Sequence, residues 1–327
     1  MKKSVKITCI VAASCIVLGL LILLGVSVKF GFDYRNLNTE TAEVKTYAVE
    51  QAFENIDIHS LSNNVEFSVA DGEQCKVVCT ETARTACTVS VENGTLTVTQ
   101  KDTRRWYEHF GMYWAFDDTH EMRIEVFLPA QEYQDLSVTA QSGNIKIGKG
   151  EPFLFKTADL STSSGEIYFE SWAERLAVSS TSGDIVCVRC GNIASLKAES
   201  NSGDIELSRI AAPELSAKTT SGNIGIYEIY VDGNADLEST SGNVTLIDTG
   251  AKSLVIATTS GNIKLTDTDA DELDIESNSG TVTGNLLSEK NFVVSTTSGE
   301  VDVPYSRDDA GRCVVKTTSG DITLHTP

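Results

Sequence analysis

The cysteines are the residues of this sequence best suited to chemistry. Cys187-Val-Arg-Cys190 has the spacing of a redox-active dithiol, or of one half of a zinc site. However, no second cysteine pair lies at metal-ligand spacing, and other repeats have Leu, Ile or Val at the positions of Cys87, Cys187 and Cys313. A small buried hydrophobe is the favoured interpretation of these three thiols. The sequence therefore predicts neither a redox site nor a zinc site.

The sequence leaves the pairing of the cysteines open. Cys75 and Cys79 lie four residues apart on one expected strand, too far apart to bond to each other. An oxidising exterior would permit other bridges, but the partners cannot be named from the sequence. The cysteines concerned are Cys75, Cys79, Cys87, Cys187, Cys190 and Cys313.

Other catalytic patterns are weak. The four histidines are scattered, and none accompanies a nucleophile motif: His59, His109, His120 and His325. Serine precedes glycine ten times in a regular series, but without the strand-to-helix context of a nucleophile elbow. The sequence predicts no catalytic residue, no cofactor and no metal site. Calcium stays an open alternative, because Asp and Asn recur beside these glycines and could supply oxygen ligands.

The ten Ser-Gly pairs define an internal repeat. Their spacings run from 18 to 22 residues, which is typical of stacked repeat architectures. The glycines, expected to form structural turns, are Gly143, Gly165, Gly183, Gly203, Gly222, Gly242, Gly261, Gly280, Gly299 and Gly320.

Each glycine stands between two expected strands. Apolar residues follow it at the second and, with one exception, the fourth position, as in Ile263 and Leu265, and similar alternating pairs precede it. This period of two indicates strands with one buried face. We expect glycine to supply a positive φ and the following Asn or Asp to cap its own turn. An antiparallel hairpin array is possible, but the near-constant period favours a parallel β-solenoid of about 20 residues per coil.

The N-terminal segment predicts a membrane anchor. Residues 1–6 contain Lys2, Lys3 and Lys6, and residues 7–28 carry no charge, which is long enough to cross a bilayer as a helix. The basic end would stay in the cytoplasm, so the remaining chain would lie outside, in a single-pass arrangement. A cleaved signal peptide is the competing interpretation. Residues 29–45 then form a polar linker.

Residues 46–135 carry a less regular form of the repeat, before the regular coils of 136–327. Asn63 takes a glycine position, and Gly94 marks a further copy. Residues 104–118 interrupt this pattern, either as a cap on the apolar end of the solenoid or as a contact surface for a partner, glycan or lipid headgroups. The aromatic residues of this segment are Trp106, Tyr107, Phe110, Tyr113, Trp114 and Phe116.

The charge of the chain restricts its partners. The formal net charge is −20 at pH 7, and acidic residues are spread over the expected outward positions. Nucleic acid and anionic lipid surfaces would be repelled, so neither is expected to bind. The remaining partners are the membrane, through the N-terminal helix, and an unknown protein or glycan of the cell envelope.

The sequence also resembles a known family. Val126-Phe127-Leu128-Pro129, Leu136-Ser-Val138 and Ser142-Gly143-Asn144-Ile145, followed by repeated Thr-Thr-Ser-Gly-Asn-Ile, are similar to the bacterial putative-adhesin domain family, over roughly residues 46–326. The resemblance implies a right-handed parallel β-helix in the cell envelope, associated with surface attachment or envelope-stress signalling. It implies no catalytic residue.

Three functions are therefore compared. The first is a non-catalytic, membrane-anchored, extracytoplasmic β-solenoid that acts as an adhesin-like or scaffold protein. The second is a regulatory subunit that senses envelope stress and acts through a membrane partner. The third, a polysaccharide-active β-helix enzyme, is disfavoured because no coil breaks the pattern to build a cleft.

Overall fold

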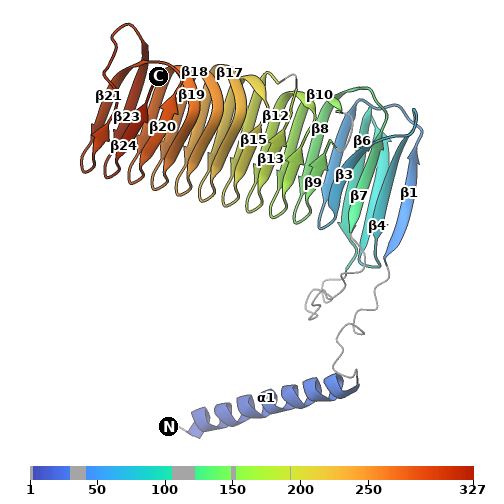
Figure 1. Cartoon of the computed structure of the whole chain (residues 1–327). Coiled ribbons are helices and arrows are strands. Elements are labelled where there is room, and N and C mark those ends of the chain that lie inside the picture. Colours follow the sequence, from blue (N-terminus) through green and yellow to red (C-terminus); the bar gives the residue numbers. More distant parts are fainter. Residues whose placement is uncertain (1–2, 30–41, 105–121, 149–151, 192) are drawn as a thin grey trace.

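The computed structural model describes residues 3–29, 42–104, 122–148, 152–191 and 193–327. One helix, α1 (Lys3–Lys29), precedes a long rod of stacked strands (Figure 1). Among the residues that the structure describes, no helix combines the length and the apolar character needed to cross a membrane. The first strand of the rod starts at Glu43, inside the predicted linker.

The middle of the rod is a parallel β-solenoid. Its strands are β8 (Glu132–Ala140), β9 (Ile145–Ile147), β10 (Leu154–Thr162), β11 (Ile167–Phe169), β12 (Trp172–Ser180), β13 (Ile185–Val188), β14 (Ser195–Ser200), β15 (Ile205–Ser208), β16 (Ala211–Thr219), β17 (Ile224–Ser239), β18 (Val244–Thr258) and β19 (Ile263–Ser277). Each pairs in parallel with its equivalent one repeat away, as in Val244↔Ile263. The prediction of an all-β solenoid with about 20 residues per coil is confirmed, with about 9 turns. The handedness of the coils stays a prediction.

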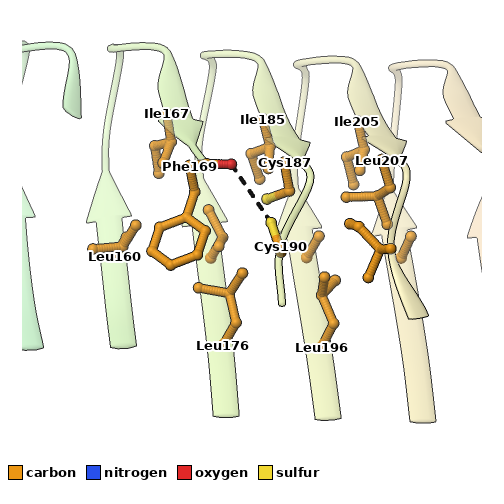
Figure 2. Close-up of a cluster of buried hydrophobic side chains, with 14 of the residues drawn as sticks. Leu160, Ile167, Phe169, Leu176, Ile185, Cys187, Cys190, Leu196, Ile205 and Leu207 are labelled. Carbon is orange, nitrogen blue, oxygen red and sulfur yellow. Dashed lines mark hydrogen bonds between the residues drawn. The ribbon is translucent and has the colours of Figure 1, made fainter. Parts of the chain in front are cut away.

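The core is a continuous column of inward side chains. Strand alternation points Ile263, Leu265, Leu273 and Ile275 of one coil into the interior, and each is at most 1% exposed. Equivalent residues of successive coils lie above one another, as Figure 2 shows for Ile167, Ile185 and Ile205 along the rod. Burial of these apolar surfaces is the main stabilising contribution.

The Ser-Gly corners require glycine for a reason that differs from our expectation. Among the described glycines, only Gly72, Gly94 and Gly148 have φ in the left-handed region, so the corner glycines do not use it. Instead, each corner packs against the backbone of the next coil. A Cβ on Gly222 would lie 1.9 Å from the carbonyl oxygen of Gly203, far inside van der Waals contact. Close backbone approach selects glycine here.

A ladder of buried hydroxyls joins the corners. In six coils, the Ser or Thr three residues before the corner glycine accepts a bond from the N–H of that glycine and donates to the glycine carbonyl of the preceding coil. Ser239 Oγ accepts from Gly242 N at 2.9 Å and donates to Gly222 O at 3.0 Å. The hydroxyls that do so belong to Thr162, Ser200, Thr219, Ser239, Thr258 and Ser277. This satisfies two buried backbone groups in each of these coils, which would otherwise carry a desolvation penalty.

The Asn and Asp residues after the glycines form an outer ladder. Asn223 Oδ1 accepts from Asn243 N at 2.9 Å, and Asn243 Oδ1 accepts from Asn262 N at 2.9 Å. These side chains bond to the next coil rather than capping their own turn, so that part of our expectation is wrong. In the coils that have both ladders, each coil is therefore hydrogen-bonded to its neighbour by a buried Ser or Thr before the corner glycine and by an Asn or Asp after it.

The left-handed conformation recurs at the second corner of the middle coils, opposite the glycines. Non-glycine residues adopt it there in five consecutive coils: Arg189, Arg209, Glu228, Asp248 and Asp267. Their φ values lie between 48° and 55°. This conformation costs an L-residue with a Cβ roughly 1–2 kcal/mol.

This strain leads to a testable prediction at Asp248, where φ is 50°. Asp248→Gly removes the steric cost, whereas Asp248→Ala removes the same charge and keeps the Cβ. We expect the glycine variant to be more stable than the alanine variant by about 1 kcal/mol, measured as the free energy of unfolding in urea. Equal stabilities would show that the corner carries no such strain.

The N-terminal end of the rod is stacked out of chain order. Its strands are β1 (Glu43–Val49), β2 (Asn55–Ser60), β3 (Asn64–Val69), β4 (Cys75–Glu81), β5 (Thr85–Glu92), β6 (Thr95–Asp102) and β7 (Arg123–Leu128). The coil of β2 and β3 lies between the coil of β8 and β9 and the coil of β6 and β7. Strands β1, β4 and β5 pair antiparallel and close this end (Figure 1).

Two predictions for this end are wrong in detail. Gly94 does not mark a coil corner: Asn93 and Gly94, with φ of 52° and 77°, form the tight turn of the β5–β6 hairpin. Asn63 does occupy a corner, and Gly143 stacks on it, but its φ is not positive. Its buried side chain faces the closing strands, donating to Thr80 O at 2.9 Å and accepting from Gln100 Nε2 at 2.7 Å.

The C-terminal end is also interleaved. Its strands are β20 (Val282–Leu286), β21 (Lys290–Thr296), β22 (Val301–Asp302), β23 (Gly311–Thr317) and β24 (Ile322–His325). The last repeat of the chain, β23 and β24, lies between the coil of β19 and β20 and the coil of β21 and β22. The corner of Gly320 accordingly packs on Gly280, and Gly299 packs on Gly320. The final strands are therefore held on both sides.

Candidate functional site

The histidines and carboxylates expected to be scattered are indeed dispersed where the structure describes them. His59 lies on β2 and contacts Asp57, with 3.2 Å between Nε2 and Oδ2, while His325 ends β24. His109 and His120 lie outside the described residues. Within the described part of the chain, no group of three or more His, Cys, Asp or Glu is arranged to hold a metal ion.

The six cysteines of the rod are buried, as predicted for Cys87, Cys187 and Cys313, whereas Cys15 on α1 is exposed. Figure 2 shows Cys187 and Cys190 side by side among Phe169, Leu176 and Leu196. The thiol of Cys190 donates to Phe169 O at 3.6 Å. The interaction with Cys190, followed by burial, raises the pKa of Cys187 well above its ordinary value. The described cysteines are free thiols, and the Cys187/Cys190 pair is too buried to act on an external substrate.

Two isolated buried thiols lead to a pH prediction. Burial raises the pKa of Cys75 and of Cys313 to about 12, whereas the unfolded thiols would titrate near 9.0. The unfolded state therefore loses these protons first, and its net proton binding falls below that of the folded state. Stability is full below pH 9 and decreases above it, by about 1.4 kcal/mol per pH unit for each thiol.

The test compares urea unfolding at neutral pH and at pH 10.5 for the parent and for Cys313→Val. The variant places a side chain of similar size in the same slot. We expect it to lose less stability on alkalinisation than the parent does. An identical loss in both proteins would show that Cys313 does not contribute to alkaline unfolding.

The predicted aromatic contact segment cannot be placed. Trp106, Tyr107, Phe110, Tyr113, Trp114 and Phe116 lie outside the described residues. The chain on either side of them is described: the segment joins β6 to β7, the two strands of the last parallel coil at the N-terminal end. Its role as a cap or as a partner contact stays a prediction.

The structure contains an open groove that the sequence did not indicate. It has a volume of about 460 Å³ and crosses several coils just before their Ser-Gly corners. We call it the corner groove. The residues that line it are Glu238, Ser239, Thr240, Ala257, Thr258, Thr259, Glu276, Ser277, Asn278, Ser295, Lys316, Thr317 and Thr318.

The corner groove results from a change in side-chain length along one outward row. The paired registers place Glu238, Ala257, Glu276, Lys316 and Ser295 next to one another in that order. The short Ala and Ser side chains leave room between the longer Glu and Lys side chains. A second row of hydroxyl and amide groups, from Thr240 to Thr318, forms the other side.

The electrostatics of the corner groove are mixed. Lys218, next to the groove, binds Glu238 Oε2 at 3.1 Å and Asp236 Oδ2 at 2.8 Å. These ion pairs, the one with Asp236 first, raise the pKa of Lys218. Glu276 and Lys316 lie opposite each other across paired strands. The groove therefore offers hydroxyl, amide, carboxylate and ammonium groups, which suit hydrogen bonding to an extended polar ligand.

Fold and surface together define a class of protein: a β-solenoid repeat protein whose outer rows of side chains are available for contacts. The family model described as Toastrack DUF4097 matches residues 53–249 and 233–327, and the chain belongs to this family. The match confirms the resemblance to an adhesin-like β-solenoid domain family.

Several solved structures match most of the chain at low identity and low TM-score. A putative lipid binding protein from Parabacteroides distasonis is 14% identical with a TM-score of 0.41, covering 87% of this chain and 97% of that chain. A putative adhesin from the same species is 12% identical with a TM-score of 0.33, covering 88% and 97%. A putative adhesin from Bacteroides fragilis is 10% identical with a TM-score of 0.28, covering 86% and 97%. Among curated proteins, none matches the sequence.

Proposed function

We propose that this protein is a membrane-anchored, extracytoplasmic scaffold that binds a component of the cell envelope without catalysis. The observation that carries the proposal is the corner groove, a polar surface of about 460 Å³ built from side chains of several stacked coils. The groove crosses five stacked coils, those of Glu238, Ala257, Glu276, Lys316 and Ser295, and suits an extended ligand better than a small substrate.

The proposed anchor is supported by the sequence alone. The uncharged run of residues 7–28 follows Lys2, Lys3 and Lys6, so the basic end would face the cytoplasm. The rod would then lie outside the cell membrane. A large negative charge on an exposed rod would keep it soluble and away from anionic surfaces.

The topology is tested with protease added to intact protoplasts that produce the full chain. We expect digestion of the rod, detected with an antibody against its C-terminal end, together with recovery of the N-terminal segment in the membrane fraction. The control is a cytosolic protein, which must stay intact in the same sample. A rod that is protected until the protoplasts are lysed would contradict the proposed location.

The groove is tested by filling it. Ala257→Gln places a longer side chain between Glu238 and Glu276, whereas Val255→Gln makes the same kind of change at an exposed position two residues earlier on β18. We expect the first variant to bind isolated envelopes at least about tenfold more weakly than the parent, and the second to bind like the parent. Equal binding of both variants would exclude the corner groove as the contact.

A further inference from the structure

A separate outward row of small and apolar residues runs along the rod beyond the second corners. The strand registers place Leu154 beside Trp172, Trp172 beside Gly191, Ala211 beside Tyr230, and Tyr230 beside Gly250. Gly191 and Ala211 both stand eight residues after their corner glycines, which continues the row between them. We call these six residues the apolar row: Leu154, Trp172, Gly191, Ala211, Tyr230 and Gly250.

The apolar row has defined ends. Glu132 lies beside Leu154 at one end, and Asp269 lies beside Gly250 at the other. Six consecutive coils thus present no charge at this position, in a chain whose formal net charge is −20. Within the row, the large side chains of Leu154, Trp172 and Tyr230 are exposed, and exposed apolar residues that recur along one face are typical of an interaction site.

The two aromatic rings of the apolar row lie over glycines. A Cβ on Gly191 would be 2.6–2.8 Å from three atoms of the Trp172 indole, so the ring covers the position where that Cβ would be. A Cβ on Gly250 would be 3.0 Å from Cδ2 of Tyr230. Trp172 is nevertheless 43% exposed and Tyr230 is 63% exposed. Glycine in the next coil therefore seats each ring and leaves much of its surface open to solvent.

Two ion pairs lie next to the apolar row. Arg189 Nε donates to Glu170 Oε1 at 2.9 Å, and Arg209 Nε donates to Glu228 Oε2 at 3.1 Å. Both pairs lie at the second corner, immediately before the row in sequence, and their side chains are partly exposed. They supply hydrogen-bond donors and acceptors, and each pair by itself carries no net charge.

We propose that the apolar row binds an extended neutral polysaccharide, whose sugar rings stack on Trp172 and Tyr230. An aromatic ring packs well against an apolar surface, such as the C–H face of a pyranose ring. Polar groups beside the aromatic ring can then bond to the sugar hydroxyls. The two aromatic residues are three coil steps apart, roughly 14 Å at the spacing of paired strands. This is long enough to engage several sugar units of one chain. Arg189 and Arg209 precede Gly191 and Ala211 of the row by two residues, and their guanidinium groups would donate to the sugar hydroxyls.

The overall charge selects against the competing classes of ligand. An anionic polymer or an anionic membrane would be repelled by the acidic rod, while a neutral glycan would not. The inference goes beyond the proposed function, because it concerns a different surface from the corner groove. It would stand even if residues 7–28 proved not to be an anchor.

Binding is tested with the full chain and two probes, the β-1,4-linked hexasaccharides of glucose and of N-acetylglucosamine. We expect calorimetric binding of at least one probe. Trp172→Ala and Tyr230→Ala should each weaken it at least tenfold, and the double variant should abolish it. Tyr305→Ala, which removes a tyrosine that is 98% exposed and lies outside the row, should bind like the parent.

A second variant tests the seating of the ring rather than the ring itself. Gly191→Ala would displace the Trp172 indole while leaving it in the protein. We expect it to weaken binding and to shift the Trp172 fluorescence, with the unfolding temperature close to that of the parent. An Ala variant that binds normally would contradict the seating argument.

Three results would overturn the proposal. The first is no binding of either probe, and the second is equal loss in the Tyr305→Ala control. The third is that Trp172→Ala and Tyr230→Ala instead abolish binding to phosphatidylcholine vesicles, or convert a dimer to a monomer in sedimentation. In that case the row would serve a membrane surface or a second copy of the chain. None of these measurements depends on the topology of the protein in cells.

Discussion

Gly242→Ala is expected to destabilise the rod by more than about 3 kcal/mol, because overpacking at this site cannot be relieved by a side chain. The new Cβ would lie 1.7 Å from the carbonyl oxygen of Gly222, which is backbone. That oxygen is held by Ser239, and the corner of Gly261 packs against Gly242 from the other side. Neither neighbouring coil can therefore move away without breaking its own contacts.

The measurement is urea unfolding of the variant beside Gly225→Ala. A Cβ on Gly225 would also be close to another atom, at 2.7 Å, but that atom belongs to the ring of Tyr227, which can rotate away. We expect this control to lose less than about 1 kcal/mol. If both substitutions had similarly small effects, close backbone stacking would not be the reason for glycine at the corners.

Excision of one complete coil is expected to leave a folded, shorter rod. The register pairs Gly250 with Asp269 and Ala251 with Ala270, so after removal of residues 251–269 Ala270 follows Gly250 in the equivalent position of Ala251. Each coil contacts mainly its neighbours, and stability is therefore close to a sum over coils and interfaces. The β content should persist, with a moderate decrease in the free energy of unfolding.

Removal of only residues 251–260 provides the matched control. It deletes one strand and part of a corner, so inward residues of the two remaining segments no longer stack and apolar side chains become exposed. We expect this variant to aggregate or to remain unfolded, judged by circular dichroism and sedimentation. Equal damage from both deletions would mean that the coils are not independent units.

The sequence by itself determined the repeat, the strand faces and the position of the corners. These features are local: the period measures the circumference of one coil, and alternation of apolar residues gives the buried face of each strand. Ile263 and Leu265 point inward for that reason, whatever the rest of the chain does. The same local pattern correctly indicated that Cys187 and Cys313 occupy core positions.

The local pattern did not reveal why the corners need glycine. Positive φ and close backbone approach both select this residue, and only the stacked coils show which applies.

The corner groove could not be predicted from the sequence either, because it depends on which residues of different coils are neighbours. Ala257 lies between two glutamates on adjacent coils, and Lys316 lies next to Glu276 only because the last repeat is interleaved.

Only the tertiary structure decided the order of the coils at the two ends and the surfaces that depend on coil neighbours. All repeats present similar edges, so sequence patterns do not distinguish stacking in chain order from insertion of β23 and β24 between earlier coils. The order of the coils depends on pairing between residues of different coils, here β23 with β19 and with β21. The same holds for Trp172 over Gly191 and Tyr230 over Gly250, since residues 19 or 20 positions apart meet only when the coils are stacked.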